Sequence, residues 1–463
     1  MTLFFSLWKQ LFSSLQLSLP KALPSASEKN AEGSLRVVDS RTGKAYTIPI
    51  VRNSIAATDL RQISTLGFGA GLLERYENGL KVMDLGFENT AVCESRITYI
   101  DGNRGTIQYR KYTLDYLVEN HDFIEVAYLL IWGHLPSKSE RNEFENALFE
   151  QSTPPQVVID VISKFPPDTP YFLVLVAGLS AWAATSPDDI PIRGAGNIYQ
   201  GKLEAVDRAI IRNLAALSTV IALTYCHQQG RKFTPRKREI SFVGNQLLMM
   251  GIVDPKTGEP EAKIEKFLGK LWILYADHEM TNSTAAFLHV SSTLADPFSG
   301  SMASLLAGSG PLHGGAIDLA YKSFQKLGSK EAVPQLIADV KAKKLRLSGY
   351  GHRIYKTVDP RVKHLKNMMN NMPEKIEKDP LLGIAMEIDR IASQDKYFTS
   401  RNLKANADLF GCFVFSALGF EPEIISAVAG MARCAGVLAH WRETMEQNPK
   451  IWRPQQVFTG DVL

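Results

Sequence analysis

Apolar and polar residues alternate in two short stretches in the first quarter of the chain. In residues 36–50 the alternation surrounds a Thr-Gly pair, and in residues 97–109 two apolar runs flank a turn that contains glycine. Alternation with a period of two fits a strand with one buried face, and a glycine-bearing turn between two such runs is typical of a β-hairpin. We therefore predict a small hairpin in each stretch.

From Leu114 onward the apolar residues recur at helical spacing, so we predict that the rest of the chain is mainly α-helical. Prolines interrupt this pattern and mark the predicted breaks between helices, at residues 135–136, 154–155, 165–167, 186–187, 255–260 and 371–373. The longest apolar runs, 171–184 and 214–226, are shorter than the roughly 20 residues that cross a bilayer. We predict buried core helices there and no membrane span.

The first 27 residues contain no acidic residue, and their large apolar side chains recur on one helical face. A Ser-rich, acid-poor amphipathic helix is typical of a mitochondrial targeting segment, but Lys9 and Lys21 are the only basic residues among these 27, and such segments are rich in arginine. A helix packed on the body of the protein and a loose tail are the alternatives. The pattern leaves both the cytoplasm and the mitochondrion open as locations.

Composition narrows the class of protein. With 463 residues, 45% apolar and 22% charged, the chain is neither disordered nor fibrous. Its 52 basic and 48 acidic residues leave a formal charge of +4, which is too small to indicate nucleic acid as the main partner. Four widely spaced cysteines without a C-x-x-C pair indicate neither a disulfide framework nor a zinc cluster, and favour a reducing compartment.

Candidate chemistry lies in four later segments in which ionisable residues occur beside glycines or at the end of an apolar run: 271–284, 310–316, 349–361 and 406–409. The histidines come from different segments and none has the H-E-x-x-H spacing, so we predict no metal site. A single histidine is usually structural. His313 and His352, however, have glycine neighbours that let a ligand approach closely, which favours a functional role.

Other features have simpler interpretations. We predict structural roles for the remaining histidines that lack such neighbours: His121, His134, His227, His289, His364 and His440. The lysine-rich, amphipathic residues 325–346 indicate a solvent-exposed helix face. Residues 67–71 do not have the strand context of a dinucleotide-binding glycine motif, so we predict a loop.

Read in order, these segments form a series of motifs: I-T-Y-I-D-G (97–102), A-D-H-E (276–279), G-P-L-H-G-G (310–315), G-x-G-H-R-x-Y-K-x-x-D-P-R (349–361), N-x-D (406–408) and R-P-x-x-x-x-T-G (453–460). From about Gly86 to Gly460 the chain resembles the citrate synthase family, which includes 2-methylcitrate synthases and fungal alkylcitrate-forming enzymes. The resemblance implies a mainly α, citrate synthase-like two-domain helical fold with short N-terminal hairpins. It also implies a homodimer.

The expected domains are an N-terminal extension (1–30), a large helical domain (31–314 and 423–463) and a small helical domain (315–422) that closes over the site. Closure would exclude water from the reactive intermediate. The reaction that the resemblance implies condenses an acyl-CoA with oxaloacetate and then hydrolyses the thioester, without a metal or other cofactor.

That reaction needs a base for a weakly acidic α-proton and donors for two carbonyl oxygens. By resemblance, Asp408 is the base, His313 is the donor to the enolate oxygen, and His352 polarises the oxaloacetate carbonyl. The expected oxaloacetate ligands are His278, Arg361, Arg433 and Arg453, the last from the neighbouring subunit. Arginine suits this role because its planar fork clamps a carboxylate. Arg353 and Lys356 are expected near CoA.

Five positions depart from the usual family pattern: Leu288, Ile317, Asp318, Ala407 and Leu409. Three of these changes make the expected surroundings of Asp408 and His313 smaller or more apolar, and each buried CH₂ of a longer acyl chain gains about 0.8 kcal/mol. We therefore predict a donor longer than acetyl and an alkylcitrate product, as in secondary metabolism. The alternatives are a citrate synthase that uses acetyl-CoA, a 2-methylcitrate synthase that uses propionyl-CoA, and a catalytically silent paralogue that binds acyl-CoA or oxaloacetate.

Overall fold

The computed structural model describes residues 31–65, 78–194, 196–376, 379–447 and 449–461. The chain forms two compact units, Met1–Glu94 with Gln455–Leu463, and Ser95–Pro454. We call them the N-terminal unit and the helical unit, and describe each by itself. The predictions for residues 1–30 and for the loop at 67–71 lie outside the described residues.

The N-terminal unit contains the first predicted hairpin. Strands β1 (Gly33–Asp39) and β2 (Lys44–Ile50) pair in antiparallel register, with Asp39 opposite Lys44 at the turn. Gly43 has a φ of 69°, which a residue with a side chain rarely adopts. A short 3-10 helix, η2 (Ala57–Gln62), follows. The alternation around the Thr-Gly pair therefore placed this hairpin correctly.

The helical unit begins with the second predicted hairpin, β3 (Thr98–Asp101) and β4 (Thr106–Tyr109). A third strand, β5 (Tyr112–Thr113), pairs with β4, although we predicted no strand beyond residue 109. Two residues are too few to show a period, so the pattern gave no signal for it. Helix α3 (Leu114–Asn120) starts directly afterwards, capped by the Thr113 side chain.

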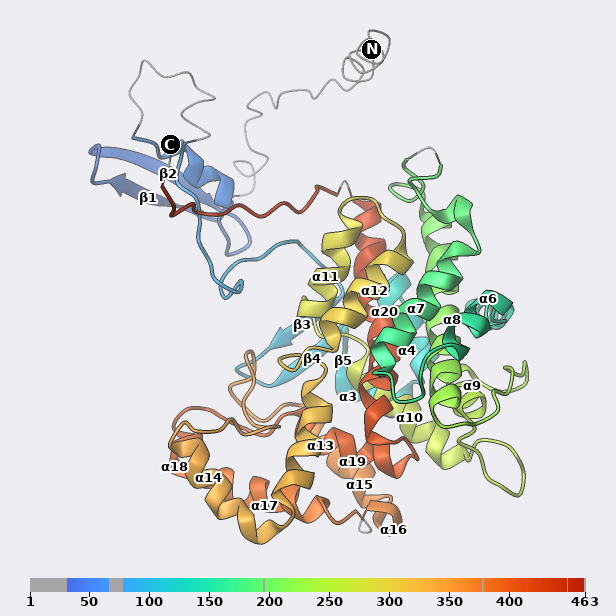
Figure 1. Cartoon of the computed structure of the whole chain (residues 1–463). Helices are drawn as coiled ribbons and strands as arrows, with labels where there is room; N and C mark the ends of the chain where they lie inside the picture. The colour runs from blue at the N-terminus through green and yellow to red at the C-terminus, as the bar shows by residue number, and fades with distance from the viewer. Residues whose placement is uncertain (1–30, 66–77, 195, 377–378, 448, 462–463) are drawn as a thin grey trace. The chain divides into compact units, whose positions relative to one another are not determined.

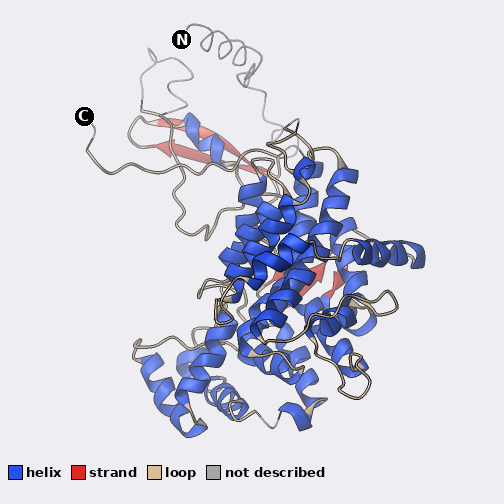
Figure 2. Cartoon of the chain, turned by 45° about the vertical axis from the view of Figure 1, so that its right-hand side comes forward, coloured by secondary structure: helices blue, strands red, loops and turns tan. Residues whose placement is uncertain are grey.

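Helices make up most of the remaining chain, as Figure 2 shows. They are α4 (Phe123–Trp132), α5 (Lys138–Glu150), α6 (Gln156–Ser163), α7 (Tyr171–Ala184), α8 (Leu203–Gln228), α9 (Phe242–Met250), α10 (Ala262–Tyr275), α11 (Asn282–Ser291), α12 (Pro297–Gly308), α13 (Ala316–Leu327), α14 (Val333–Lys341), α15 (Arg361–Asn370), α16 (Pro373–Ile376), α17 (Leu382–Ala392), α18 (Lys396–Thr399), α19 (Ala407–Ala417) and α20 (Ile425–Glu446). The mainly helical prediction is confirmed. In the lysine-rich segment the lysines are exposed as predicted, but the segment is not one helix: it contains the end of α13, a 3-10 helix η4 (Lys330–Ala332) and α14, and two of its lysines follow α14.

Two segments are long and apolar enough to cross a membrane by length and composition, Leu203–Gln228 and Pro422–Glu446. The apolar run predicted at 214–226 is thus part of a longer helix. Of the most apolar window in each, 89% and 78% is buried inside the structure. Packing against other helices accounts for this apolar character, so it does not by itself indicate a membrane span.

Helices α13 to α19 gather at one end of the helical unit (Figure 1), where α19 packs on α13 and α15, and α14 packs on α17. They fall within residues 315–422, the predicted small domain. The division into a large and a small domain, and the closure of one over the other, stay predictions.

Helix α20 passes very close to the end of α10, at Gly436. The Gly436 amide donates to the Ala276 carbonyl at 3.1 Å, and a Cβ at this position would overlap the Ala276 carbonyl and the Asp277 carboxylate. This close approach fixes the position of α20 relative to the end of α10. It therefore also fixes Arg433, whose Nε donates to the Tyr275 carbonyl at 2.8 Å. The glycine is therefore a packing requirement.

We expect Gly436→Ala to destabilise the protein, because neither backbone nor carboxylate can move away cheaply. Overpacking of this kind costs about 1 to 3 kcal/mol, which for a chain of this length corresponds to a fall in melting temperature of about one to three degrees. Thermal melting monitored by circular dichroism measures it. Gly383→Ala in α17 is the control, because no atom lies within 4 Å of its added Cβ. Equal melting temperatures for the two variants would contradict the packing argument.

Candidate active site

A cavity of about 1080 Å³ lies in the helical unit, between residues that are far apart in the sequence. It brings together seven of the nine residues predicted for the site, because these line its wall: His278, His313, His352, Arg353, Arg361, Asp408 and Arg433. Lys356 and Arg453 do not line it. The predicted catalytic trio of one acid and two imidazoles therefore faces a single cavity.

The His313 side chain is oriented by the start of α11. The Ser283 backbone N–H donates to His313 Nε2 at 3.3 Å, and the Ser283 hydroxyl lies 2.8 Å from the same atom. Because Nε2 accepts from an amide, the proton of the neutral ring sits on Nδ1, which can then act as a donor. Burial, reinforced by the nearby positive charge of Arg433, lowers the pKa of His313 to about 4, so the ring is neutral near pH 7.

His352 is held in the opposite tautomer. The Ile354 backbone N–H donates to His352 Nδ1 at 3.1 Å, with the Tyr355 N–H at 3.5 Å, so the ring proton sits on Nε2. Burial and the charge of Arg361 lower the pKa of His352 to about 4. The cavity therefore contains two neutral imidazoles, and each has one ring N–H left for a ligand.

A third histidine, His278, packs against His352. The two ring centres are 5.3 Å apart, and His278 Nε2 lies 2.8 Å from the Tyr355 hydroxyl. Burial and then the charge of Arg361 lower the pKa of His278 well below its usual value. Tyr355, which we did not assign to the site, thus orients His278 while its ring packs 4.6 Å from that of His352.

Asp408 is the second residue of α19, whose N-cap is Asn406. No residue within the described part of the chain donates a hydrogen bond to the Asp408 carboxylate. Burial raises the pKa of Asp408 to about 6, although the charge of Arg361 opposes the shift. An ionised carboxylate that is desolvated and has no donor is a stronger base than an exposed aspartate.

Backbone contacts hold the segment of His352 against that of Asp408. The Asn406 backbone N–H donates to the Gly349 carbonyl at 3.0 Å, and its side chain donates to the Gly351 carbonyl at 2.8 Å. Tyr350 and Ala405 pair in an isolated antiparallel β-bridge. Gly349, at φ 75°, lies so close to Leu409 that an added Cβ would be 2.7 Å from its Cα. The G-Y-G-H and N-x-D motifs are therefore two sides of one structural element.

Arg361 has a carboxylate partner that we did not assign to the site. Asp359 accepts from Arg361 Nε at 3.0 Å and Nη2 at 2.7 Å, and also from the Ala407 N–H at 3.2 Å. Burial opposes ionisation of Asp359, but pairing with Arg361 outweighs it and lowers the pKa of the carboxyl group. One edge of the Arg361 guanidinium is thus occupied, and the other edge remains for a ligand. The D-P-R motif contained this pair, but sequence alone does not show that it folds back on itself.

Arg433, like Arg361, is a guanidinium of the cavity wall that is removed from solvent. It forms no ion pair within 4.0 Å in the described part of the chain, and its Nε donates to the Tyr275 carbonyl. Burial lowers the pKa of Arg433, with Asp277 as the largest opposing influence. Because Asp359 balances Arg361, this uncompensated guanidinium makes the cavity attractive to an anion.

The remaining predicted ligands have different positions. Arg353 lines the cavity and is largely exposed. Lys356 is also exposed but does not line the cavity, and its backbone N–H donates to the Gly102 carbonyl at 2.9 Å. Arg453 is exposed beyond α20 and away from the cavity of its own chain. Its predicted contribution from a neighbouring subunit, and the proximity of Arg353 and Lys356 to CoA, stay predictions.

The positions that depart from the family pattern differ in whether they line the cavity. Ile317 lines the cavity, but Leu288, Ala407 and Leu409 are fully buried and do not line it. Leu409 instead packs on Gly349. Our use of these changes as evidence for a roomier acyl site was therefore wrong except at Ile317. Burial also raises the pKa of Asp318 to about 6, beside the Ser426 side chain.

The six histidines predicted to be structural all contact protein groups. His121, His134, His364 and His440 lie beside Glu125, Glu140, Asp115 and Asp277, His227 lies beside the Phe165 carbonyl, and His289 lies against Trp452. In the described ranges no group of three or more His, Cys, Asp or Glu is placed to hold a metal ion.

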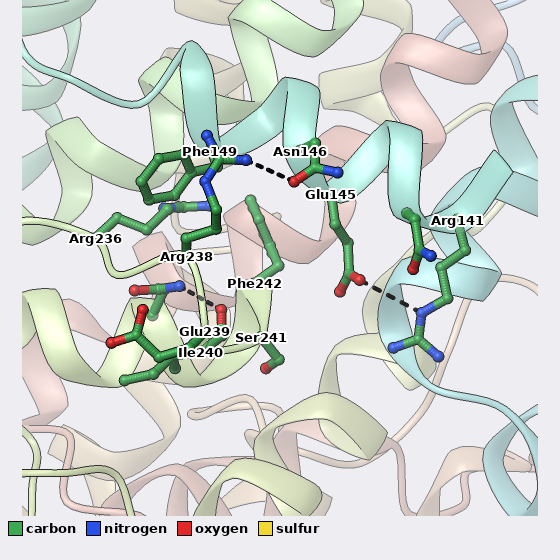
Figure 3. Close-up of a pocket in the computed structure, with 12 residues that line it drawn as sticks. Arg141, Glu145, Asn146, Phe149, Arg236, Arg238, Glu239, Ile240, Ser241 and Phe242 are labelled. Carbon is green, nitrogen blue, oxygen red and sulfur yellow. Dashed lines mark hydrogen bonds and ion pairs between the residues drawn. The ribbon is translucent and has the colours of Figure 1, made fainter. Parts of the chain in front are cut away.

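A second cavity, of about 380 Å³, contains none of the predicted site residues. Arg236 lies 4.5 Å from the centre of the Phe242 ring and Arg238 lies 4.4 Å from that of Phe149, while Arg238 also donates to Asn146, as Figure 3 shows. Burial lowers the pKa of Arg236 to about 9. These guanidiniums hold the segment before α9 on α5 and α9, so we interpret them as structural.

Comparisons with known proteins agree with this fold. The family model described as citrate synthase, C-terminal domain, matches residues 86–455. The chain is 47% identical to the citrate synthase-like protein oryE of Aspergillus oryzae, over 93% of this chain and 96% of that protein. It is 38% identical to the alkylcitrate synthase phiJ of a fungal species, over 94% and 95% of the two chains.

Among solved structures, a citrate synthase of Thermoplasma acidophilum in complex with carboxymethyl coenzyme A and oxaloacetate superposes with a TM-score of 0.74. It is 27% identical, and the match covers 81% of this chain and 96% of that one. The fold and site are those of a condensing transferase. The chain belongs to the citrate synthase family.

The two tautomers can be tested directly. We expect two-bond ¹H–¹⁵N spectra of histidine-labelled protein at pH 7 to show a neutral, Nδ1-protonated ring for His313 and a neutral, Nε2-protonated ring for His352, because a backbone N–H occupies the other nitrogen of each. His313→Gln and His352→Gln identify the signals by their loss. The same tautomer for both rings, or a charged ring for either, would sink the assignment.

Proposed function

We propose that this protein condenses an acyl-CoA with oxaloacetate and hydrolyses the resulting thioester, which gives an alkylcitrate and free CoA. One observation carries the proposal: Asp408, a desolvated carboxylate to which no described residue donates a hydrogen bond, faces the same cavity as two neutral imidazoles with opposite tautomers. A base and two N–H donors are what a carbon–carbon condensation between a thioester and a ketone requires.

In the first step, Asp408 removes a proton from the α-carbon of the acyl-CoA, and the electron pair moves onto the thioester oxygen. His313 donates its Nδ1–H to that oxygen, which stabilises the enolate without a net positive charge on the ring. A neutral donor suits this role because its weakly acidic N–H matches an enolate better than it matches the original carbonyl. The Ser283 N–H keeps the proton on the correct nitrogen.

In the second step, the α-carbon attacks the ketone carbon of oxaloacetate, and the electron pair of that carbonyl becomes an alkoxide. His352 donates a hydrogen bond from its Nε2–H to this oxygen as the negative charge develops, and the new hydroxyl takes up one proton in place of the one that Asp408 removed from the α-carbon, so that Asp408 ends ionised and His352 ends neutral. The free edge of Arg361 and the unpaired guanidinium of Arg433 clamp the two carboxylates of oxaloacetate, beside His278. Water then cleaves the C–S bond, and the products are an alkylcitrate and CoA–SH.

Arg453 completes the oxaloacetate site from the neighbouring subunit of a homodimer in this proposal. Its exposure beyond α20, outside the cavity of its own chain, leaves it available to a second copy. The Arg353 to Lys356 stretch lies at the edge of the cavity and contacts the phosphates of CoA. No metal or cofactor takes part in either step.

The acyl donor is longer than acetyl in this proposal. Tyr171, Phe172, Leu305 and Ile317 are among the apolar residues that line the cavity, whereas acetyl-CoA presents only a methyl group. Similarity to the alkylcitrate synthase phiJ supports the same donor class. A citrate synthase that uses acetyl-CoA is the second candidate, favoured by similarity to proteins of that name such as the glyoxysomal enzyme of Cucurbita maxima.

We expect oxaloacetate-dependent release of free CoA to be faster with hexanoyl- or decanoyl-CoA than with acetyl- or propionyl-CoA. The physical reason is the burial of additional CH₂ groups at about 0.8 kcal/mol each. A thiol reagent measures the released CoA, and mass spectrometry identifies the alkylcitrate. A clear preference for acetyl-CoA would identify an ordinary citrate synthase, and propionyl-CoA would identify a 2-methylcitrate synthase.

Asp408→Asn is the matched control for this assay, since it removes the base and changes the shape of the side chain little. We expect turnover to fall by about 10²- to 10⁴-fold while oxaloacetate binding, measured by calorimetry, is retained. If neither the wild type nor the variant releases CoA from any thioester, but both bind oxaloacetate, the protein is a catalytically silent paralogue.

The pH dependence follows from the same groups. Asp408 acts only when ionised, and its pKa is raised to about 6, so kcat/KM should rise with pH through a midpoint near 6. The rings of His313 and His352 change from charged to neutral near pH 4, so they should not contribute to the change in kcat/KM near pH 6. Initial rates at saturating oxaloacetate across this range measure the midpoint. A midpoint near 4 would assign the rate-controlling ionisation to another group.

A further inference from the structure

One part of the cavity has no charged residue among those that line it, and on α20 this part begins one helical turn before Arg433. Its wall comes from the faces of α12 and α20 that meet beside the first turn of α13: Ser301, Ser304, Leu305, Ala316, Ile317, Ala427, Ala429 and Gly430. We call this part of the cavity the side lobe. The Ser301 hydroxyl is directed to the buried Asn213 side chain at 2.9 Å. The Ser301 hydroxyl therefore donates its hydrogen bond to another residue of the protein.

The side lobe begins at the proposed catalytic groups. The loop that carries His313 is tied to α12 by a hydrogen bond from the Gly315 N–H to the Gly308 carbonyl at 3.0 Å, and to α20 by the Ser426 hydroxyl, which donates to the Gly314 carbonyl at 3.3 Å. Both walls of the lobe therefore start beside His313.

Ile317 connects the lobe to the proposed base. It lies one helical turn after His313, and its Cδ1 is 3.3 Å from the position of a Cβ on Gly411, which is one turn after Asp408. A substituent on the carbon that Asp408 deprotonates, next to the oxygen that His313 holds, would thus point along Ile317 into the lobe.

Small residues keep the lobe open on the α20 side. Ala429 and Gly430 lie one helical turn before Arg433, so their side of α20 continues from the oxaloacetate site into the lobe. A Cβ added to Gly430 would meet only one atom within 4 Å, Leu305 Cδ2 at 3.8 Å, which is an ordinary contact. There is therefore space above Gly430, and Leu305 is the side chain across it.

We propose that the acyl chain of the donor lies in the side lobe, and that the opposed pair Gly430 and Leu305 sets the chain length that the enzyme accepts. This inference rests on the proposed function, since it needs an acyl-CoA to be deprotonated by Asp408. The thioester α-carbon stays at Asp408 and His313 for every donor, and only the carbons beyond it enter the lobe. Chain-length selection is thus separate from the catalytic groups.

The test compares kcat/KM for acetyl-, hexanoyl- and decanoyl-CoA in three variants. Gly430→Leu fills the lobe from α20 and should lower kcat/KM for the long donors by about ten- to a hundredfold relative to acetyl-CoA. Leu305→Ala removes the opposite side chain and should shift the preference toward decanoyl-CoA. Gly383→Leu in α17 makes the same change where no atom lies within 4 Å of the added Cβ and outside the cavity, and should leave the ratio between donors unchanged.

The outcomes separate the two proposals. If wild-type protein releases no CoA from any donor, the proposed function fails. If it turns over the long donors and Gly430→Leu slows all three thioesters equally, or none, the chain lies elsewhere and the inference about the side lobe is overturned. Because a folding defect would lower all rates together, the ratio of long- to short-chain kcat/KM is the deciding quantity. The opposite shift expected from Leu305→Ala provides a second test.

Discussion

The active-site architecture depends on one buried carboxylate, that of Asp359. It accepts hydrogen bonds from two nitrogens of the Arg361 guanidinium and from the Ala407 N–H at the start of α19. Without it, Arg361 would be an uncompensated cation in a nearly dry site, which is strongly unfavourable. Because Ala407 directly precedes Asp408, the same carboxylate that neutralises the arginine also positions the proposed base. Charge balance and geometry are therefore secured by a single group.

Burial of the cavity has opposite effects on its acid and on its imidazoles. It raises the pKa of Asp408 and lowers the pKa of His313 and His352, because in each case the neutral form loses less solvation energy. The midpoints are about 6 and about 4, so near neutral pH the acid is ionised and both rings are neutral. One property of the site, its low polarity, thereby sets three protonation states at once, and backbone N–H groups decide only which ring nitrogen carries the proton.

Sequence patterns predicted the elements better than they predicted the contacts. A continuous apolar run placed α7 at Tyr171–Ala184, and alternation placed both hairpins, because each signal is local to a few residues. The motifs also brought His313, His352 and Asp408 to one cavity. Tyr355 and Asp359 lay inside the same motifs, yet their roles were missed. Both act through neighbours that only the folded chain brings together.

The positions that depart from the family pattern also show that a place in the sequence near a motif does not predict contact with the cavity. Ala407 and Leu409 are next to Asp408 in the sequence, but a helix turns neighbouring side chains away from one another, so both face the core, and Leu288 in α11 is buried as well. Ala429 and Gly430, by contrast, belong to no motif and reach the cavity because α20 presents them on the same side as Arg433.

The residues proposed to carry out the reaction and those proposed to select the acyl donor therefore lie in different parts of the chain. Short motifs hold the reacting groups, and hydrogen bonds such as those of Asn406 and Asp359 fix the segments that carry them. The side lobe is bounded by faces of α12 and α20, where a change of side-chain volume disturbs few hydrogen bonds. Such a wall can change with little cost to the site beside it. A family with this arrangement can alter its acyl donor while the condensing groups stay in place.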